Sequence, residues 1–342
     1  MSFVEKKLFP ITSNINMTKR GPQPIAQVLD DLATSKILPL NTLRALSDLG
    51  GQPLADFRAG WPKLPPEKRL ATLQALGELA EDLFELNINA VSRVALHDPD
   101  AQVRAAAIRN LWEDQGDDLI APFLQFLTND SSEAVRAAAA TALGSYVYLG
   151  EIEELPEDQT QAIEKALLAA YYGHDTLEVR RRALESLGFL PRPEAIAAID
   201  QAYENGDDLL RASALFAMGR SLDPERWGEY IIAELTHSNT QVRFEAVRAT
   251  GELQLEDAAV TLGQLLHDPD AAVQEMTVWA LGEIGGDEAR RFLQDRLETA
   301  DDELIELIED ALANTDMVDG ILDLSMLDLD DDDEQARKAR LN

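Results

Sequence analysis

The feature that most constrains this chain is an internal repeat of roughly 31 residues. Each copy starts its second half with a small polar turn, then a Val-Arg pair or its equivalent, then an Ala-rich stretch. The first residues of these pairs are Val103, Val135, Val179, Leu210, Val242 and Val273. Successive intervals are 32, 44, 31, 32 and 31 residues, and the interval of 44 holds an insertion over residues 146–159. Six aligned copies predict a repeat array.

Each copy predicts two helices. In the second helix, Val135, Ala138, Ala139, Ala142 and Leu143 recur at helical spacing and form one apolar stripe. A glycine follows this stripe in most copies, which predicts either a helix end or a point of close packing. These glycines are Gly144, Gly188, Gly219, Gly251 and Gly282. One hairpin cannot bury its own stripe, so the expected fold is all-α, a right-handed α-solenoid of stacked helical hairpins.

The ends of the chain differ in composition from the array. We expect a flexible N-terminal segment over 1–23, a helical cap or degenerate repeats over 24–63, and the array over 64–315. A cap is expected because an end repeat would otherwise expose its apolar stacking face. Residues 316–342 alternate Leu, Ile and Met with acids and end in an Asp run. They predict either a disordered solubilising tail or a motif that docks on a partner or on the chain's own concave face.

The order of turn, Val-Arg, Ala-rich helix and Leu-Gly end resembles HEAT repeats, especially the short bacterial HEAT-like class of phycobilin lyase-type proteins. The resemblance covers about Leu64 to Asn314. In HEAT repeats a turn Asp and the Arg six residues later form a ladder between repeats. The resemblance therefore implies ladder residues at Asp98, Arg104, Asp130 and Arg136. Later copies depart from the pattern, with His174/Arg180, Asn205/Arg211, His237/Arg243 and Asp268/Gln274.

The turn sequence His97-Asp98-Pro99-Asp100 raises the question of metal or acid/base chemistry. All four histidines lie in such turns, at positions 97, 174, 237 and 267. Metal ligands must converge within ~2.0–2.2 Å of the ion, whereas equivalent turns of a solenoid lie roughly 10 Å apart. We therefore predict a structural turn, with Asp98 as the N-cap and Pro99 in the first turn of the helix. No catalytic residue, metal or cofactor is predicted. The resemblance extends to deoxyhypusine hydroxylase-like HEAT enzymes, but these need His-Glu pairs and the chain has none.

The charge balance limits the partners. The formal net charge is −33, from 30 basic and 63 acidic residues, which disfavours nucleic acid and anionic membranes. There is no cysteine, no secretory signal, and no stretch of the ~20 apolar residues that a membrane helix needs. We expect a cytoplasmic protein.

One row of residues is the candidate binding surface. Positions two and six after the aligned Val lie beside the buried stripe, and from the third copy onward they include Arg181, Phe216, Phe244, Arg248 and Trp279. Arginine and aromatic residues dominate protein interfaces, although the same side chains could simply pack between helices. The prediction is a non-catalytic protein–protein interaction scaffold that binds a protein or peptide on its concave face. The alternative implied by the resemblance is a phycobilin lyase/isomerase-like enzyme or its accessory subunit.

Overall fold

The computed structural model describes residues 23–83 and 85–315, and within them every regular element is a helix. This confirms the all-α repeat fold predicted from the sequence. The predicted tail, and the N-terminal segment except for residue 23, lie outside the described residues. The chain divides into two compact units with the boundary between Leu187 and Gly188, a division that falls inside the array predicted over 64–315.

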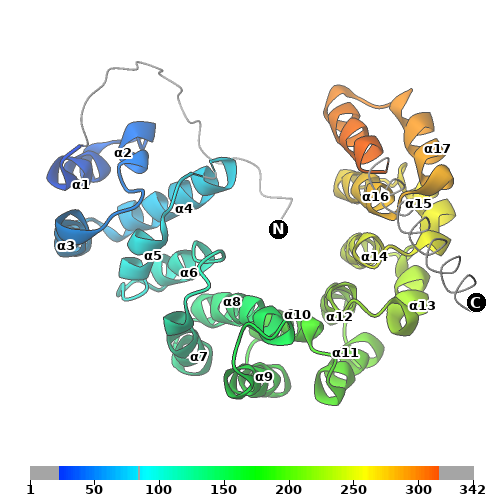
Figure 1. The fold of residues 1–342 in the computed structure, drawn as a ribbon, viewed down its shortest axis with the longest axis horizontal. Helices are drawn as coiled ribbons and strands as arrows, with labels where there is room; N and C mark the ends of the chain where they lie inside the picture. The colour runs from blue at the N-terminus through cyan, green and yellow to red at the C-terminus, as the bar shows by residue number, and fades with distance from the viewer. Residues whose placement is uncertain (1–22, 84, 316–342) are drawn as a thin grey trace, which may run out of the picture. The chain divides into compact units, whose positions relative to one another are not determined.

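Unit 1 begins with three helices over the predicted cap, followed by hairpins (Figure 1). Its helices are α1 (Ile25–Thr34), α2 (Leu40–Arg44), α3 (Gly51–Gly60), η1 (Trp61–Lys63), α4 (Pro66–Asp82), α5 (Asn89–Ala95), α6 (Ala101–Arg109), η2 (Asp117–Leu119), α7 (Ile120–Asn129), α8 (Glu133–Glu151), α9 (Glu157–Tyr172) and α10 (Leu177–Ser186). The second helices α4, α6, α8 and α10 pack in sequence along one layer. The insertion over 146–159 lengthens α8 to Glu151, and a short turn over residues 152–156 leads into α9.

Unit 2 continues the same pattern after the short η3 (Leu187–Phe189) (Figure 1). Its helices are α11 (Pro193–Asn205), α12 (Asp208–Arg220), α13 (Pro224–Glu234), α14 (Thr240–Glu252), η4 (Glu256–Ala258), α15 (Ala259–Leu265), α16 (Ala271–Ile284) and α17 (Gly286–Leu297), followed by helical residues 302–315. The second helices α12, α14 and α16 lie side by side in one layer. We call the side of this layer that is turned away from the first helices α11, α13 and α15 the second-helix face.

The repeated glycines are close-packing points between successive second helices. A Cβ added to Gly219 would lie 2.9 Å from the Ala249 Cα, and one on Gly251 would lie 2.9 Å from the Ala280 Cα. The next contact, between Gly282 and Ala311, repeats this register at 3.1 Å. Gly219, Gly251 and Gly282 lie inside helices, so they do not end them. Each Gly–Ala contact fixes which residues of neighbouring helices lie opposite each other.

The start of α6 differs from the prediction. Asp100 is the N-cap, and its carboxylate accepts hydrogen bonds from the N–H groups of Gln102 and Val103. The prediction that Asp98 is the N-cap and that Pro99 lies in the helix is therefore wrong. Asp100 is the carboxylate within reach of the free N–H groups of the first turn, whereas Asp98 accepts from the Asp100 N–H at 2.9 Å.

Candidate partner-binding surface

The turns are joined by an arginine–aspartate ladder whose rungs connect neighbouring repeats. Arg104 donates to the backbone oxygen of Asp98 at 2.8 Å and pairs with the carboxylate of Asp130 at 2.9 Å. Arg136 in turn pairs with Asp175 at 2.7 Å. Asp98 and Arg104 are thus not side-chain partners of each other, because each arginine reaches the carboxylate of the following turn.

The ladder extends beyond the residues predicted for it. Arg69 pairs with Asp98 at 2.9 Å, and Arg243 pairs with Asp268 at 2.8 Å, and all four side chains are nearly buried. Arg69 lies seven residues before a Leu-Gly pair, Leu76-Gly77, as Arg136 lies before Leu143-Gly144, so the spacing of the repeat could have found it.

Where the next turn has no aspartate at the position equivalent to Asp98, the arginine stacks on a tyrosine of the first helix of its own repeat. The Arg211 guanidinium stacks on the Tyr203 ring, 5.5 Å from its centroid, and the Tyr203 hydroxyl donates to the Glu234 carboxylate at 2.7 Å. Burial, together with that hydrogen bond and the Glu234 charge, raises the pKa of Tyr203 to about 12. Arg180 stacks on Tyr171 in the same way, at 5.7 Å.

One of the four histidines, His237, makes a side-chain hydrogen bond within its turn. His237 Nδ1 accepts a hydrogen bond from the Asn239 N–H at 3.0 Å, which is the contact that Asp98 makes with Asp100. Among residues 23–83 and 85–315 no three His, Asp or Glu side chains form a group that could hold a metal ion.

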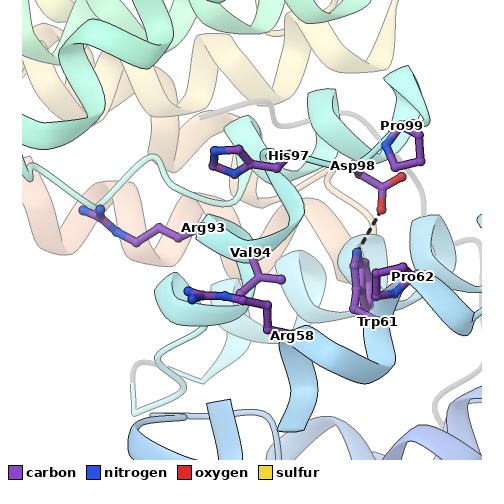
Figure 2. Close-up of a pocket in the computed structure, with 8 residues that line it drawn as sticks. All are labelled: Arg58, Trp61, Pro62, Arg93, Val94, His97, Asp98 and Pro99. Carbon is purple, nitrogen blue, oxygen red and sulfur yellow. Dashed lines mark hydrogen bonds between the residues drawn. The ribbon is translucent and has the colours of Figure 1, made fainter. Parts of the chain in front are cut away.

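A pocket of about 460 Å³ lies in unit 1 between the end of α3, η1 and α5 (Figure 2). Two of its charged side chains, those of Asp98 and Arg93, have partners in the chain. The Asp98 carboxylate accepts from Trp61 Nε1 at 2.9 Å and pairs with Arg69. Arg93 pairs with Asp114 and Asp118, and these hydrogen bonds raise its pKa. These contacts tie the walls of the pocket to the turns around it.

The five predicted binding residues belong to both units of the chain. Arg181 lies in unit 1 on α10, where it is buried and pairs with Glu178 and Glu185. The other four lie on the second-helix face of unit 2, where Phe216, Phe244, Arg248 and Trp279 are half-buried.

Phe216 and Arg248 form the best-defined contact on this face. The Arg248 guanidinium carbon lies 3.9 Å from the Phe216 ring centroid, and Nη2 donates to the Phe216 backbone oxygen at 3.1 Å. Glu245 pairs with Arg248 at 2.7 Å, and Glu252 pairs with it from the other side. Burial acts to lower the pKa of Arg248, but the two carboxylates outweigh it and the pKa is raised. The contact between Phe216 and Arg248 is thus made within the chain.

Trp279 is placed differently. A Cβ added to Gly251 would lie 2.7 Å from the indole Cζ3, so the ring leans against α14. Among the described residues, no cation or second ring stacks on this indole and no hydrogen bond engages it. The sequence missed three participants of this face, namely Arg220 over Phe216 at 4.4 Å, and the carboxylates of Glu245 and Glu252. Their spacing of three or four residues from Phe216 and Arg248 is the signal that could have found them.

Comparisons with known proteins agree with the repeat. Residues 88–157 and 229–313 match the HEAT repeats family. A HEAT repeat-containing taxis protein of Halobacterium salinarum is 33% identical over 126 residues, a match that spans 31% of this chain and 31% of that protein.

Two solved structures show a weaker similarity to this chain. The complex of CpcE and CpcF of phycocyanin lyase from Nostoc is 20% identical, with 66% of this chain and 94% of that chain covered and a TM-score of 0.43. Human deoxyhypusine hydroxylase is 18% identical, with 76% and 95% covered and a TM-score of 0.34. Within the described residues, none of the helices is long and apolar enough to span a membrane.

Proposed function

We propose that the chain is a non-catalytic protein-interaction scaffold that binds a protein or peptide on the second-helix face of unit 2. The observation that carries the proposal is the spacing of half-buried aromatic side chains on successive helices, with Phe216 on α12, Phe244 on α14 and Trp279 on α16. Aromatic and arginine side chains that are partly desolvated before binding supply most of the energy of protein interfaces.

The charge and the absence of cysteine fit this function. A surface with a net charge of −33 keeps an extended array soluble and repels nucleic acid, and a chain without cysteine is compatible with the reducing cytoplasm. The edge of the array that is formed by the turns, which we call the turn edge, pairs the arginines and aspartates of the ladder within the chain. The ladder therefore stabilises the array, and the second-helix face is the surface that we assign to recognition.

Affinity purification of the full chain, followed by mass spectrometry, tests the proposal. We expect one stoichiometric protein to be captured, to bind again when both proteins are purified, and to be lost when Phe244 and Trp279 are changed to Ala. The matched control is Trp112→Ala, because Trp112 is 53% exposed and lies in unit 1. Capture that survives the face variants, or is lost equally with the control, contradicts the proposal. A coloured preparation would instead favour the lyase-like enzyme.

A further inference from the structure

The repeat register places four different residues in one line along the second-helix face. Each second helix has an alanine that packs on a glycine of the preceding repeat, and these alanines are Ala217, Ala249, Ala280 and Ala311. The residue just before each alanine therefore lies next to the equivalent residue of the neighbouring helix. In chain order the line consists of Phe216, Arg248, Trp279 and Asp310. The first two form an aromatic ring with a guanidinium from the next helix stacked on it.

The second aromatic residue of the line, Trp279, has no arginine at the position that follows it. The position that follows Trp279, equivalent to that of Arg248 after Phe216, is held by the exposed Asp310. Glu275 and Glu283 lie four residues before and after Trp279, which places them on the same side of α16 as the indole. Trp279 therefore lies among carboxylates, and no arginine or lysine among the described residues stacks on it.

We propose that Trp279, with Glu275, Glu283 and Asp310, is the site that takes an arginine side chain from the partner. The bound guanidinium would repeat the arrangement of Arg248 on Phe216 between Glu245 and Glu252. Tryptophan is the best ring for a cation, and carboxylates at the rim add charge-assisted hydrogen bonds. The Asp-rich segment 328–333 of this chain fits the site less well than an arginine, because it would bring further negative charge to the same carboxylates.

The surroundings of Glu283 support a cationic occupant. Its carboxylate accepts one hydrogen bond, from Asn314 Nδ2 at 3.1 Å. Burial raises its pKa, and the Asn314 contact offsets this only in part. Glu275 has no hydrogen-bond or ion-pair partner among the described residues. A guanidinium between Glu275 and Glu283 would donate hydrogen bonds to both carboxylates and offset one of their two negative charges.

This inference rests on the proposed function, and a peptide titration tests it separately. The four tryptophan indole N–H signals of the full chain are followed by NMR, with that of Trp279 assigned from Trp279→Phe. The probes are a glycine–serine peptide that carries arginines and the same peptide with neutral citrulline. We expect the arginine peptide to shift the Trp279 signal saturably, an effect weakened by salt, and the citrulline peptide to leave it unmoved.

Two charge variants complete the test. Glu275→Gln with Glu283→Gln should weaken arginine-peptide binding about five-fold, the change expected for two partly exposed ion pairs. The matched control, Glu229→Gln with Glu256→Gln, removes the same charge from exposed positions on α13 and η4 and should change binding less than about two-fold. Equal responses to arginine and citrulline, or equal losses in both double variants, overturn the inference.

The outcomes also separate this inference from the proposed function. If partner capture needs Phe244 and Trp279 but ignores Glu275→Gln with Glu283→Gln, the face binds a partner and arginine capture is wrong. If capture ignores Phe244 and Trp279, the proposed function fails whatever the peptide does. Self-association that saturates the Trp279 signal without any peptide would identify a second copy as the occupant and overturn the arginine assignment.

Discussion

In unit 2, Asp268 and Glu283 flank the same second helix, one in the turn before α16 and the other at the C-terminal end of that helix. Both are partly or fully buried, yet their pKa values shift in opposite directions. Burial acts to raise the pKa of Asp268, but hydrogen bonds from Arg243 and from the Asp270 N–H outweigh it and the pKa is lowered. Burial raises the pKa of Glu283 because its one hydrogen bond, from Asn314, is not enough. The turn edge completes its charge pairs within the chain, whereas the second-helix face leaves carboxylates for another molecule.

The largest effect should come from breaking a rung of the ladder. Asp268→Ala leaves the Arg243 guanidinium, whose side chain is 11% exposed, without its carboxylate and should lower the free energy of unfolding by about 3 kcal/mol. Urea unfolding measures this loss. Asp257→Ala, at an exposed position in η4, is the control and should change stability by less than about 0.5 kcal/mol. A loss of that small size for Asp268→Ala would show that the rung is not structural.

Two glycines on neighbouring elements sharpen the contrast between packed and open positions. A Cβ on Gly251 would meet Trp279 and the Ala280 backbone, so Gly251→Ala should cost about 1–3 kcal/mol and displace the indole. A Cβ on Gly228, inside α13, would lie 3.4 Å from Leu255, an ordinary contact. Gly228→Ala should be neutral or stabilise by up to about 1 kcal/mol, because alanine favours the helix. Thermal unfolding and the NMR signal of the Trp279 indole N–H distinguish the two variants, and equal effects would contradict the Gly–Ala contacts between neighbouring helices.

The paired and unpaired carboxylates of the face should respond with opposite signs. Glu245→Gln with Glu252→Gln removes the partners of Arg248 and should lower stability by about 1–2 kcal/mol. Glu275→Gln with Glu283→Gln removes carboxylates that lack a cation and should leave stability unchanged or raise it by up to about 0.5 kcal/mol. Urea unfolding of both double variants checks the signs. A loss of stability in Glu275→Gln with Glu283→Gln would mean that a cation of this chain already pairs with these carboxylates.

The smallest effect concerns pH. The contribution of Asp268 is present above its ordinary pKa of 3.8 and is lost as the pH falls through its lower pKa in the folded chain. The contribution of Glu283 is present below its ordinary pKa of 4.5 and is lost as the pH rises through its higher pKa in the folded chain. Carboxyl carbon shifts measured by NMR should show Asp268 titrating below 3.8 and Glu283 above 4.5. The reverse order would remove the distinction between edge and face.

The repeat predicted the architecture well because its information is local. Ala-rich stripes and the glycine after each stripe define both helices and their close contacts, as the Gly251–Ala280 packing shows. The partners of the ladder were harder to predict, because Arg104 reaches an aspartate 26 residues away in the next turn. The contact of Arg211 with Tyr203 depends on a ring from the first helix, which the turn sequence alone does not reveal.

The sequence predicted which residues line the candidate site, but not the contacts that they make. Spacing identified Phe216, Arg248 and Trp279, but not that Arg248 turns back onto Phe216 and leaves Trp279 without a cation. Arg181 shares the spacing, yet it is buried between Glu178 and Glu185 in unit 1. Side-chain direction and the choice among competing carboxylates depend on tertiary packing, and a single sequence carries little information about either.

Site-specific photo-crosslinking of the purified complex tests the central claim most directly. A benzophenone side chain placed at Glu275, on the second-helix face, should crosslink to the partner, whereas the same group at Glu229, exposed on the first helix α13, should not. Crosslinks from Glu229, with none from Glu275, would show that the partner binds the layer of first helices and would contradict binding on the second-helix face.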